Sequence, residues 1–410
     1  MSLIDEIRKH DKKGLFTSND AFANYLTGFA PLDYANGFYL DVKNEETGTM
    51  TQRAIKGIIG GTFTTVIGKS GSGKTTLAVQ MGANIIRPFE DGILVYVDAE
   101  RTALKQRLCD ITGIRNDDPR LILRNDKTSI EDVFELVQGI CEGKASDPAR
   151  FMYEVPSLIE GHEPFKMYVP TVIVIDSLYT FASRERKDTE LEGGMSSNRE
   201  AKEIAQFYSK CLNNMSEYNI TIIVVNHIRP KIEANPFSHT PSQLVMIKQG
   251  ESIPRGETPI YLSQNVFRCS ILRPSENTYT IEKDGFSGYK VQVQIAKTKT
   301  AFVGATVNLV LNSKFGFDPI FTLFEFAKDA GILNGRNPYF YFTDFEDVKF
   351  SRNQFRGRYI AEKDFRKLVN TAVRPALESL IGTKDYEGEV NITADSYFVD
   401  PNSLDTDVTL

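Results

Sequence analysis

The sequence predicts an α/β fold in which a central, mostly parallel β-sheet carries helices on both faces. Four short apolar runs, at 62–67, 92–97, 171–175 and 220–225, are separated by longer stretches of helical or polar character. Continuous apolar runs of this length are typical of strands that are buried on both faces of a parallel sheet. In chain order, the residues that end these runs are Gly68, Asp98, Asp176 and Asn226. Polar residues at the carboxyl ends of such strands are expected to line a ligand site.

The pattern changes after residue 265. Three runs, 266–272, 289–296 and 305–311, leave little room for helices between them and predict an antiparallel extension of the same sheet. Residues 320–380 return to helical periodicity. We therefore expect an N-terminal helical segment over 1–24 that could contact another protomer, a core over 25–335, a C-terminal helical region over 336–383 and an acidic tail over 384–410.

The charge distribution leaves nucleic-acid binding open, and the spacing of cysteines and histidines argues against zinc sites and disulfides. Seven acids and one lysine give residues 384–410 a charge of −6, which equals the formal net charge of the chain, so residues 1–383 are formally neutral. The overall acidity therefore does not argue against nucleic-acid binding by the body of the protein. The four cysteines and four histidines are scattered along the chain, which predicts buried free thiols instead of a zinc site or disulfides.

Two further segments are predicted to be insertions, at 41–54 and 144–169, and neither suggests a function. No stretch approaches 18 consecutive apolar residues, and the N-terminus lacks the apolar core of a signal peptide. The sequence therefore predicts a cytoplasmic protein.

A phosphate loop follows the first strand. It fits the pattern GxxxxGK[ST] and leads into a helical pattern; its residues are Gly68, Lys69, Ser70, Gly71, Ser72, Gly73, Lys74 and Thr75, with Thr76 next in the helix. Glycines allow backbone N–H groups to surround phosphate oxygens, and the helix dipole adds positive potential. We expect Lys74 to contact the β- and γ-phosphates of ATP and Thr75 to bind Mg²⁺.

Acidic and amide side chains end the other central strands. Asp176 is expected to hold Mg²⁺ together with Thr75. Either Asp98 or Glu100 could deprotonate the attacking water, because strand alternation places both on one face and spacing does not choose between them. Asn226 could sense the γ-phosphate or merely form a turn.

Taken in order, these motifs resemble those of RecA-type recombinases. The resemblance rests on T-G-F-A-P-L-D (27–33), the phosphate loop, V-Y-V-D-A-E (95–100), V-I-D-S (174–177), V-V-N-H (224–227) and A-K-T-K-T (296–300), and it covers roughly 25–335. The sequence is most similar to phage strand-exchange proteins of the UvsX type, whose corresponding strand also ends in Asn-His. A phage origin would place the protein in the host cytoplasm.

The resemblance implies roles for individual residues. It assigns Glu100 as the catalytic carboxylate and Asn226 as the γ-phosphate sensor. It also implies that Lys297 and Lys299 reach the ATP of a neighbouring subunit, as an arginine finger would; spacing alone would favour a solvated strand face for both. Bacterial RecA stacks the adenine on a tyrosine, but residues 101–107 contain no aromatic residue, which leaves the contact with the base undefined.

The resemblance also implies two DNA-binding loops, near 183–199 and over 228–264. The second loop leaves the end of a central strand, where α/β sheets bind ligands. Basic side chains would neutralise phosphates and aromatic ones could wedge between bases. The basic residues are Arg184, Arg186, Lys187 and Arg199 in the first loop and Arg229, Lys231, Lys248 and Arg255 in the second.

The expected function is that of a DNA-dependent ATPase that forms helical filaments on single-stranded DNA and exchanges strands with double-stranded DNA. Expected partners are both forms of DNA, further copies of the chain, and single-strand-binding and mediator proteins. The acidic tail could compete with DNA for the basic loops. Two alternatives remain open: a hexameric replicative helicase of the DnaB type, and a RecA-like regulatory ATPase that does not bind DNA.

Overall fold

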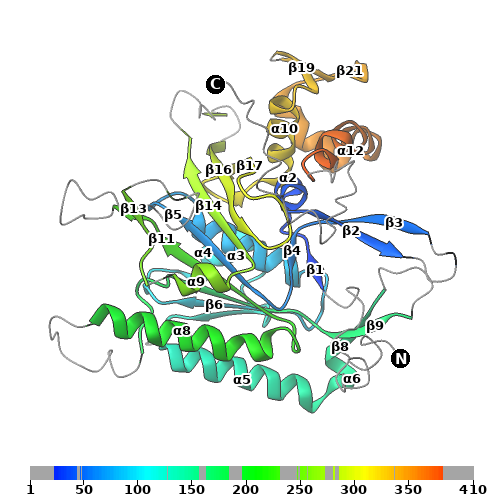
Figure 1. Ribbon diagram of the computed structural model, residues 1–410. Helices are drawn as coiled ribbons and strands as arrows, with labels where there is room; N and C mark the ends of the chain where they lie inside the picture. Colours follow the sequence, from blue (N-terminus) through cyan, green and yellow to red (C-terminus); the bar gives the residue numbers. More distant parts are fainter. Residues whose placement is uncertain are drawn as a thin grey trace, which may run out of the picture.

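The computed structural model describes residues 23–43, 47, 49–126, 128–156, 163–183, 196–230, 247, 250–255, 257–272, 280–281, 286–336 and 338–381 (Figure 1). Most of the N-terminal segment expected at 1–24 and all of the acidic tail expected at 384–410 lie outside these ranges. Among the described residues, no helix is both long and apolar enough to cross a membrane.

A ten-stranded sheet forms the centre of the molecule. Its main path has the order β18-β17-β16-β14-β5-β11-β10-β6-β7. The strands from β14 to β7 run parallel to one another: β5 (Phe63–Gly68), β6 (Ile93–Asp98), β7 (Leu121–Arg124), β10 (Thr171–Asp176), β11 (Ile220–His227) and β14 (Asn265–Ile271). Four of them coincide with the apolar runs of the sequence, so the prediction of a mostly parallel central sheet is confirmed.

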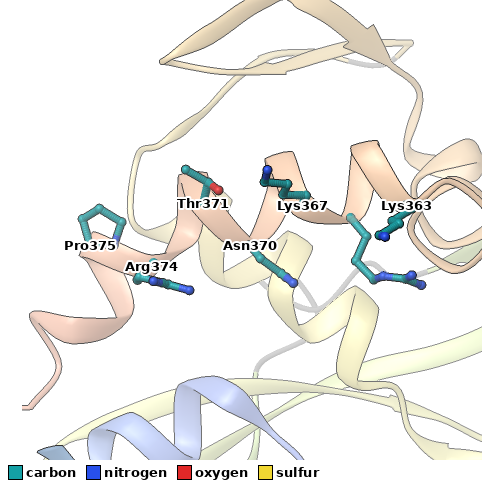
Figure 2. A pocket seen from close by; sticks show the side chains of 7 residues that line it. Lys363, Lys367, Asn370, Thr371, Arg374 and Pro375 are labelled. Atoms are coloured by element: carbon teal, nitrogen blue, oxygen red, sulfur yellow. The ribbon is translucent and has the colours of Figure 1, made fainter.

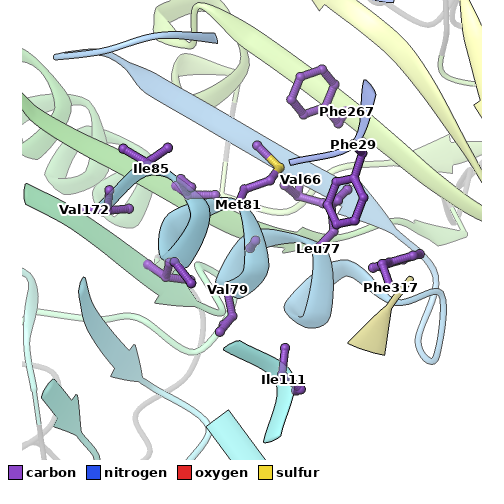
Figure 3. Close-up of a cluster of buried hydrophobic side chains, with 14 of the residues drawn as sticks. Phe29, Val66, Leu77, Val79, Met81, Ile85, Ile111, Val172, Phe267 and Phe317 are labelled. Carbon is purple, nitrogen blue, oxygen red and sulfur yellow. The ribbon is translucent and has the colours of Figure 1, made fainter. Parts of the chain in front are cut away.

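Helices cover both faces of this sheet (Figure 1). The helices α3 (Lys74–Ile86) and α4 (Lys105–Thr112) cover one face, and α5 (Ile130–Ser146) and α8 (Ser196–Met215) cover the other. Leu77 and Met81 of α3 pack against Val66 of β5 and Phe267 of β14 (Figure 3). Phe63, three residues before Val66, packs on the opposite face among residues of α8. The central strands are therefore buried on both sides.

The antiparallel extension consists of β16 (Phe286–Thr298), β17 (Thr306–Asn312) and β18 (Gly316–Phe317), with the short β15 (Thr280–Ile281) beside β16. The prediction was wrong for 266–272, because β14 lies parallel to β5, with Val266 opposite Thr65. The long connection from β11 to β14, which contains α9 (Thr258–Leu262), supplies the crossover that this arrangement requires.

Smaller elements surround the core. At the N-terminal side, β1 (Asn24–Tyr25) pairs with β4 (Ile58–Ile59), next to α2 (Ala30–Ala35). The two predicted insertions contain hairpins, which are β2 (Phe38–Lys43) with β3 (Met50–Ile55), and β8 (Met152–Val155) with β9 (Phe165–Tyr168) after α6 (Pro148–Phe151). A 3.1 Å hydrogen bond between Tyr153 and Tyr25 holds the second hairpin against β1. The four cysteines are buried and free.

The C-terminal region contains a small sheet that the prediction of a helical region missed. The strands β19 (Leu333–Arg336), β20 (Tyr339–Phe342) and β21 (Phe345–Phe350) lie between α10 (Pro319–Asp329) and the pair α11 (Arg352–Ala361) and α12 (Lys363–Glu378). Their runs are short and rich in aromatic residues, which favour strands. Phe324, Phe342, Phe350 and Phe355 form a core shared by all these elements.

One side of α12 is basic. Lys363, Lys367, Asn370 and Arg374 follow one another at intervals of three or four residues and line a shallow surface pocket together with Arg366 (Figure 2). Residues at this spacing share one face of a helix. The C-terminal region therefore adds a cationic surface outside the two predicted loops.

Three ion pairs hold the C-terminal region together and against the sheet. The buried Glu325 of α10 pairs with Lys290 of β16 and, at 3.1 Å, with Arg352 of α11. Asp318 pairs with Arg356 at 3.0 Å. Because Glu325 is 2% exposed, its removal would leave two partly buried cations without their carboxylate.

We expect Glu325→Ala to lower the free energy of unfolding by roughly 3 kcal/mol, since breaking a buried ion pair leaves uncompensated charge. Urea unfolding followed by circular dichroism measures this change. The control is Asp117→Ala, which breaks the exposed Arg115–Asp117 pair and should cost less than about 1 kcal/mol. Equal effects of the two substitutions would contradict the structural role of Glu325.

Candidate nucleotide-binding site

The phosphate loop connects β5 to α3 and leaves the first turn of α3 without a capping side chain. Gly71 and Gly73 have φ angles of +75° and +83°, a conformation that glycine adopts without strain. A Cβ at Gly73 would also lie 3.0 Å from the ring of Phe317. The free N–H groups at the start of α3 can therefore bind an anion such as a triphosphate.

Lys74 is the first residue of α3, and its side chain lies against the phosphate loop. It is buried, and its Nζ donates to the backbone oxygen of Lys69 at 2.7 Å. Burial lowers the pKa of Lys74, although the negative charges of Asp176 and Glu100 oppose the shift. The side chain is thus held across the loop, at the place where the sequence predicts contact with phosphates.

Asp176 ends β10 beside the first turn of α3. Its Oδ2 accepts hydrogen bonds from Thr75 Oγ1 at 2.5 Å and from Tyr96 Oη at 2.9 Å. Burial raises the pKa of Asp176, and the two hydrogen bonds offset part of that shift. A carboxylate and a hydroxyl that meet in this way fit Mg²⁺, which prefers oxygen ligands. Mg²⁺ held by Thr75 and Asp176 would neutralise charge on the phosphates.

The structure separates the two carboxylates that follow β6. Asp98 is buried, and its Oδ2 accepts a hydrogen bond from the backbone N–H of Ala103 at 2.6 Å. Glu100 is partly exposed; its Oε1 accepts from Ser177 Oγ at 2.6 Å and lies 3.2 Å from His227 Nε2. Burial opposes ionisation of Glu100, but the contacts with Ser177 and His227 outweigh it and lower its pKa. Glu100 is therefore an ionised, partly exposed carboxylate, whereas Asp98 supports a turn.

The side chain of Asn226 points away from the phosphate loop and toward the long loop that follows β11, so its predicted role as the γ-phosphate sensor stays a prediction. Its Nδ2 donates to the backbone oxygen of Pro254 at 3.0 Å, and its Oδ1 accepts from the N–H of His227. Alternate residues of β11 point to opposite faces. Val225 packs on the face covered by α3, so His227 shares that face and Asn226 does not. His227, which the sequence analysis overlooked, is the residue of this pair that reaches Glu100.

A cavity of about 370 Å³ adjoins the phosphate loop. Arg107 of α4 and Tyr289 of β16 line it together with Leu311 and Asn312. Tyr289 Oη donates to the backbone oxygen of Gly71 at 3.1 Å, and Arg107 Nη1 donates to that of Lys314 at 2.7 Å. Both planar groups can stack on a nucleobase. The cavity thus offers a contact for the base that residues 101–107 alone did not define.

Lys297 and Lys299 lie at the end of β16, close to α9. Lys297 Nζ donates to three backbone oxygens that end α9, those of Ile260, Tyr261 and Ser263, at 2.7, 2.7 and 3.0 Å. Burial and the nearby charge of Lys299 lower the pKa of Lys297 to about 8. Lys299 is exposed. Within one protomer the two lysines therefore differ, because Lys297 caps a helix and Lys299 faces solvent.

Most of the predicted DNA-binding residues lie outside the described residues, namely Arg184, Arg186, Lys187, Lys231 and Lys248. Arg199 is part of α8, but its side chain is not described. The remaining two, Arg229 and Arg255, come from the two ends of the 228–264 loop and meet at Tyr179. The ends of this loop are paired as the short strands β12 (Arg229–Pro230) and β13 (Glu251–Ser252).

Comparisons with known proteins agree with this site. The model of an AAA domain family matches residues 40–231. Protein RecA of Malacoplasma penetrans (strain HF-2) is 22% identical over 348 residues, which are 83% of this chain and 85% of that protein. Protein RecA of Aquifex aeolicus (strain VF5) is 24% identical over 295 residues (71% and 70%), and that of Thermus aquaticus 25% over 289 residues (70% and 71%).

Three kinds of observation thus lead to one family. The sheet and its helices form a RecA-like core, and the nucleotide site has a phosphate loop, an acid-ended strand and a separate ionised glutamate. Curated relatives that match over more than two thirds of their own length carry one name. The chain is similar to the RecA-type P-loop ATPases in its sequence, its fold and its nucleotide site.

Proposed function

We propose that this protein is a DNA-dependent ATPase that polymerises on single-stranded DNA and catalyses homologous pairing and strand exchange. The observation that carries the proposal is the end of β11. Its last two side chains face opposite ways: His227 contacts the carboxylate of Glu100, and Asn226 binds the carbonyl of Pro254 at the returning end of the 228–264 loop. One strand thus connects the nucleotide site to the loop that is expected to bind DNA.

In this proposal the chain's own residues carry out hydrolysis as follows. The first turn of α3 and Lys74 bind the triphosphate, and Thr75 and Asp176 hold Mg²⁺. Glu100 accepts a proton from the water that attacks the γ-phosphorus, and ADP and phosphate are released. Ser177 and His227 orient Glu100 and keep it ionised. His227, in place of Asn226, is then the side chain that can sense the γ-phosphate.

The nucleotide state reaches the DNA loop through β11. A γ-phosphate that attracts His227 would shift the end of β11, and Asn226 would carry that shift to Pro254. Because Arg255 follows Pro254 directly, the same movement acts on the returning end of the loop. Such a switch needs an element with two arrangements whose populations depend on both the nucleotide and the DNA. The hydrogen-bonded end of β11 is the candidate for this element.

Assembly would complete the site in trans. Lys299 is exposed beside Lys297 at the end of β16, where the family resemblance expects contact with the ATP of the next subunit. A cation supplied across an interface stabilises the negative transition state, so hydrolysis would depend on polymerisation. The likeness to phage proteins of the UvsX type, and duplex DNA as second substrate, are part of the same proposal.

Electron microscopy tests the proposed assembly. With single-stranded DNA and a non-hydrolysable ATP analogue, negatively stained samples should contain helical filaments, and ATP hydrolysis should rise when single-stranded DNA is added. Closed rings that unwind duplexes would favour the helicase. If the particles do not bind the added DNA and the DNA does not change the rate of ATP hydrolysis, the result would favour the regulatory ATPase.

The choice between the two carboxylates is tested by a matched pair of substitutions. Glu100→Gln should lower the turnover number at least about 100-fold, because the general base is lost, while filaments still form. Asp98→Asn keeps an oxygen that can accept from Ala103 and should change turnover less than about threefold. Steady-state hydrolysis with single-stranded DNA measures both. Full activity of Glu100→Gln would reassign the base.

The trans contribution is tested by mixing inactive variants. Lys299→Ala should lower DNA-stimulated hydrolysis at least about 100-fold without changing the melting temperature. Lys74→Ala should be inactive for a separate reason, because its own phosphate loop lacks the lysine that binds the triphosphate. In a mixed filament, the phosphate loop of one variant meets the intact Lys299 of the other, so part of the activity should return.

Two comparisons complete this test. Lys297→Ala should also lower the melting temperature, because α9 loses its cap, whereas Lys328→Ala on an exposed side of α10 should alter neither property. A mixture of Lys299→Ala and Lys74→Ala that stays inactive while it co-assembles would rule out the trans role.

A further inference from the structure

Tyr179 contacts Arg229 and Arg255, two described residues of the expected 228–264 DNA-binding loop. It follows the end of β10 by three residues and precedes the segment near 183–199. The backbone around it is fixed, since the N–H of Leu178 donates to the backbone oxygen of Val225 at 2.9 Å. Its side chain is only partly buried. The backbone that carries the ring is therefore held in place, and the ring itself is partly exposed. The ATP hydrolysis described above does not use it.

Arg229 covers one face of this ring. The guanidinium carbon of Arg229 lies 3.7 Å from the centroid of the Tyr179 ring. This is the spacing of two planar groups in contact, and a nucleobase is a planar group that stacks on aromatic rings in the same manner. Arg229 itself is exposed at the outgoing end of the loop, so it can turn toward a phosphate. A base and the guanidinium would therefore compete for one face.

Arg255 supports the ring from another direction. Its Nε and Nη2 donate to the backbone oxygen of Tyr179 at 3.0 and 2.5 Å, and its guanidinium carbon lies 5.8 Å from the ring centroid. Arg255 adopts φ = +73°, which is strained for a residue with a side chain. Its guanidinium is half-buried, and that burial lowers its pKa. Arg255 therefore supports the backbone of Tyr179 in this structure, and its predicted contact with a phosphate stays a prediction.

We propose that the ring of Tyr179 is a stacking site for one base of single-stranded DNA, which Arg229 covers when no strand is bound. The inference rests on the proposed function and names a base-binding residue for it. On binding, Arg229 leaves the ring and contacts a backbone phosphate, and the base takes its place. The exchange is favourable because the strand gains both a stacked base and a phosphate contact, whereas the free protein loses only one exposed cation–π contact.

The composition of the chain allows a direct test, because it contains no tryptophan. Tyr179→Trp places a single fluorescent indole at the proposed site. An oligonucleotide of thymidines should quench the emission, whereas an abasic oligonucleotide of the same length and charge should not. The matched control is Tyr339→Trp, at a residue that is 66% exposed in the C-terminal region, whose emission should not distinguish the two strands.

Strand affinity gives the second readout. Measured by anisotropy of a labelled oligonucleotide, Tyr179→Leu should weaken binding about tenfold with an unchanged melting temperature, and Tyr179→Phe, which keeps the ring, should change it less than about twofold. Equal quenching by thymidine and abasic strands, or none while the strand is bound, would overturn the proposal and leave the DNA-dependent ATPase intact. Absence of strand binding by the unaltered protein would instead overturn the proposed function.

Discussion

The register of the four central parallel strands is the constraint on which the nucleotide site depends. It sets His227 opposite Gly68 and Asp176 opposite Asp98, so that the strand ends lie at one level. A slip of one residue in β10 or β11 would turn the ligand side chain to the opposite face. The two apolar layers prevent such a slip, because both faces of these strands are packed. The residues that pack the core therefore also fix the geometry of the nucleotide site.

The same register points the last two side chains of β11 to opposite faces of the sheet. His227 shares the face of α3 and reaches Glu100, whereas Asn226 faces the other way and reaches the loop. Both hydrogen-bonding groups of the fully buried Asn226 amide have partners, and leaving such a group without one is costly. In the proposed function, a movement at the nucleotide would therefore rearrange these hydrogen bonds.

Local patterns explain what the sequence could predict. The phosphate loop and Asp176 could be proposed from the sequence because each is defined by its strand and its neighbours in the chain. The choice between Asp98 and Glu100 needed the contacts that each makes in the folded chain, and the direction of the Asn226 side chain needed the face of β11 to which it belongs. A run such as 220–225 is apolar at every position, so it has no alternation that assigns a face. The direction of β14, the sheet β19–β20–β21 and the stack on Tyr179 depend on contacts between segments far apart in the chain, which no local pattern encodes.

In the proposed function, the lysines at the end of β16 would connect assembly to the DNA loop. Lys297 caps α9, which lies between the returning end of the loop and β14, and its charge is opposed by that of Lys299. A phosphate from a neighbouring subunit would meet the exposed Lys299 first and relieve this repulsion. If Lys297 then turned toward the same phosphate, three carbonyl oxygens of α9 would lose their donor. We therefore infer that contact between subunits loosens α9, so that the interface and the DNA loop respond to a single event.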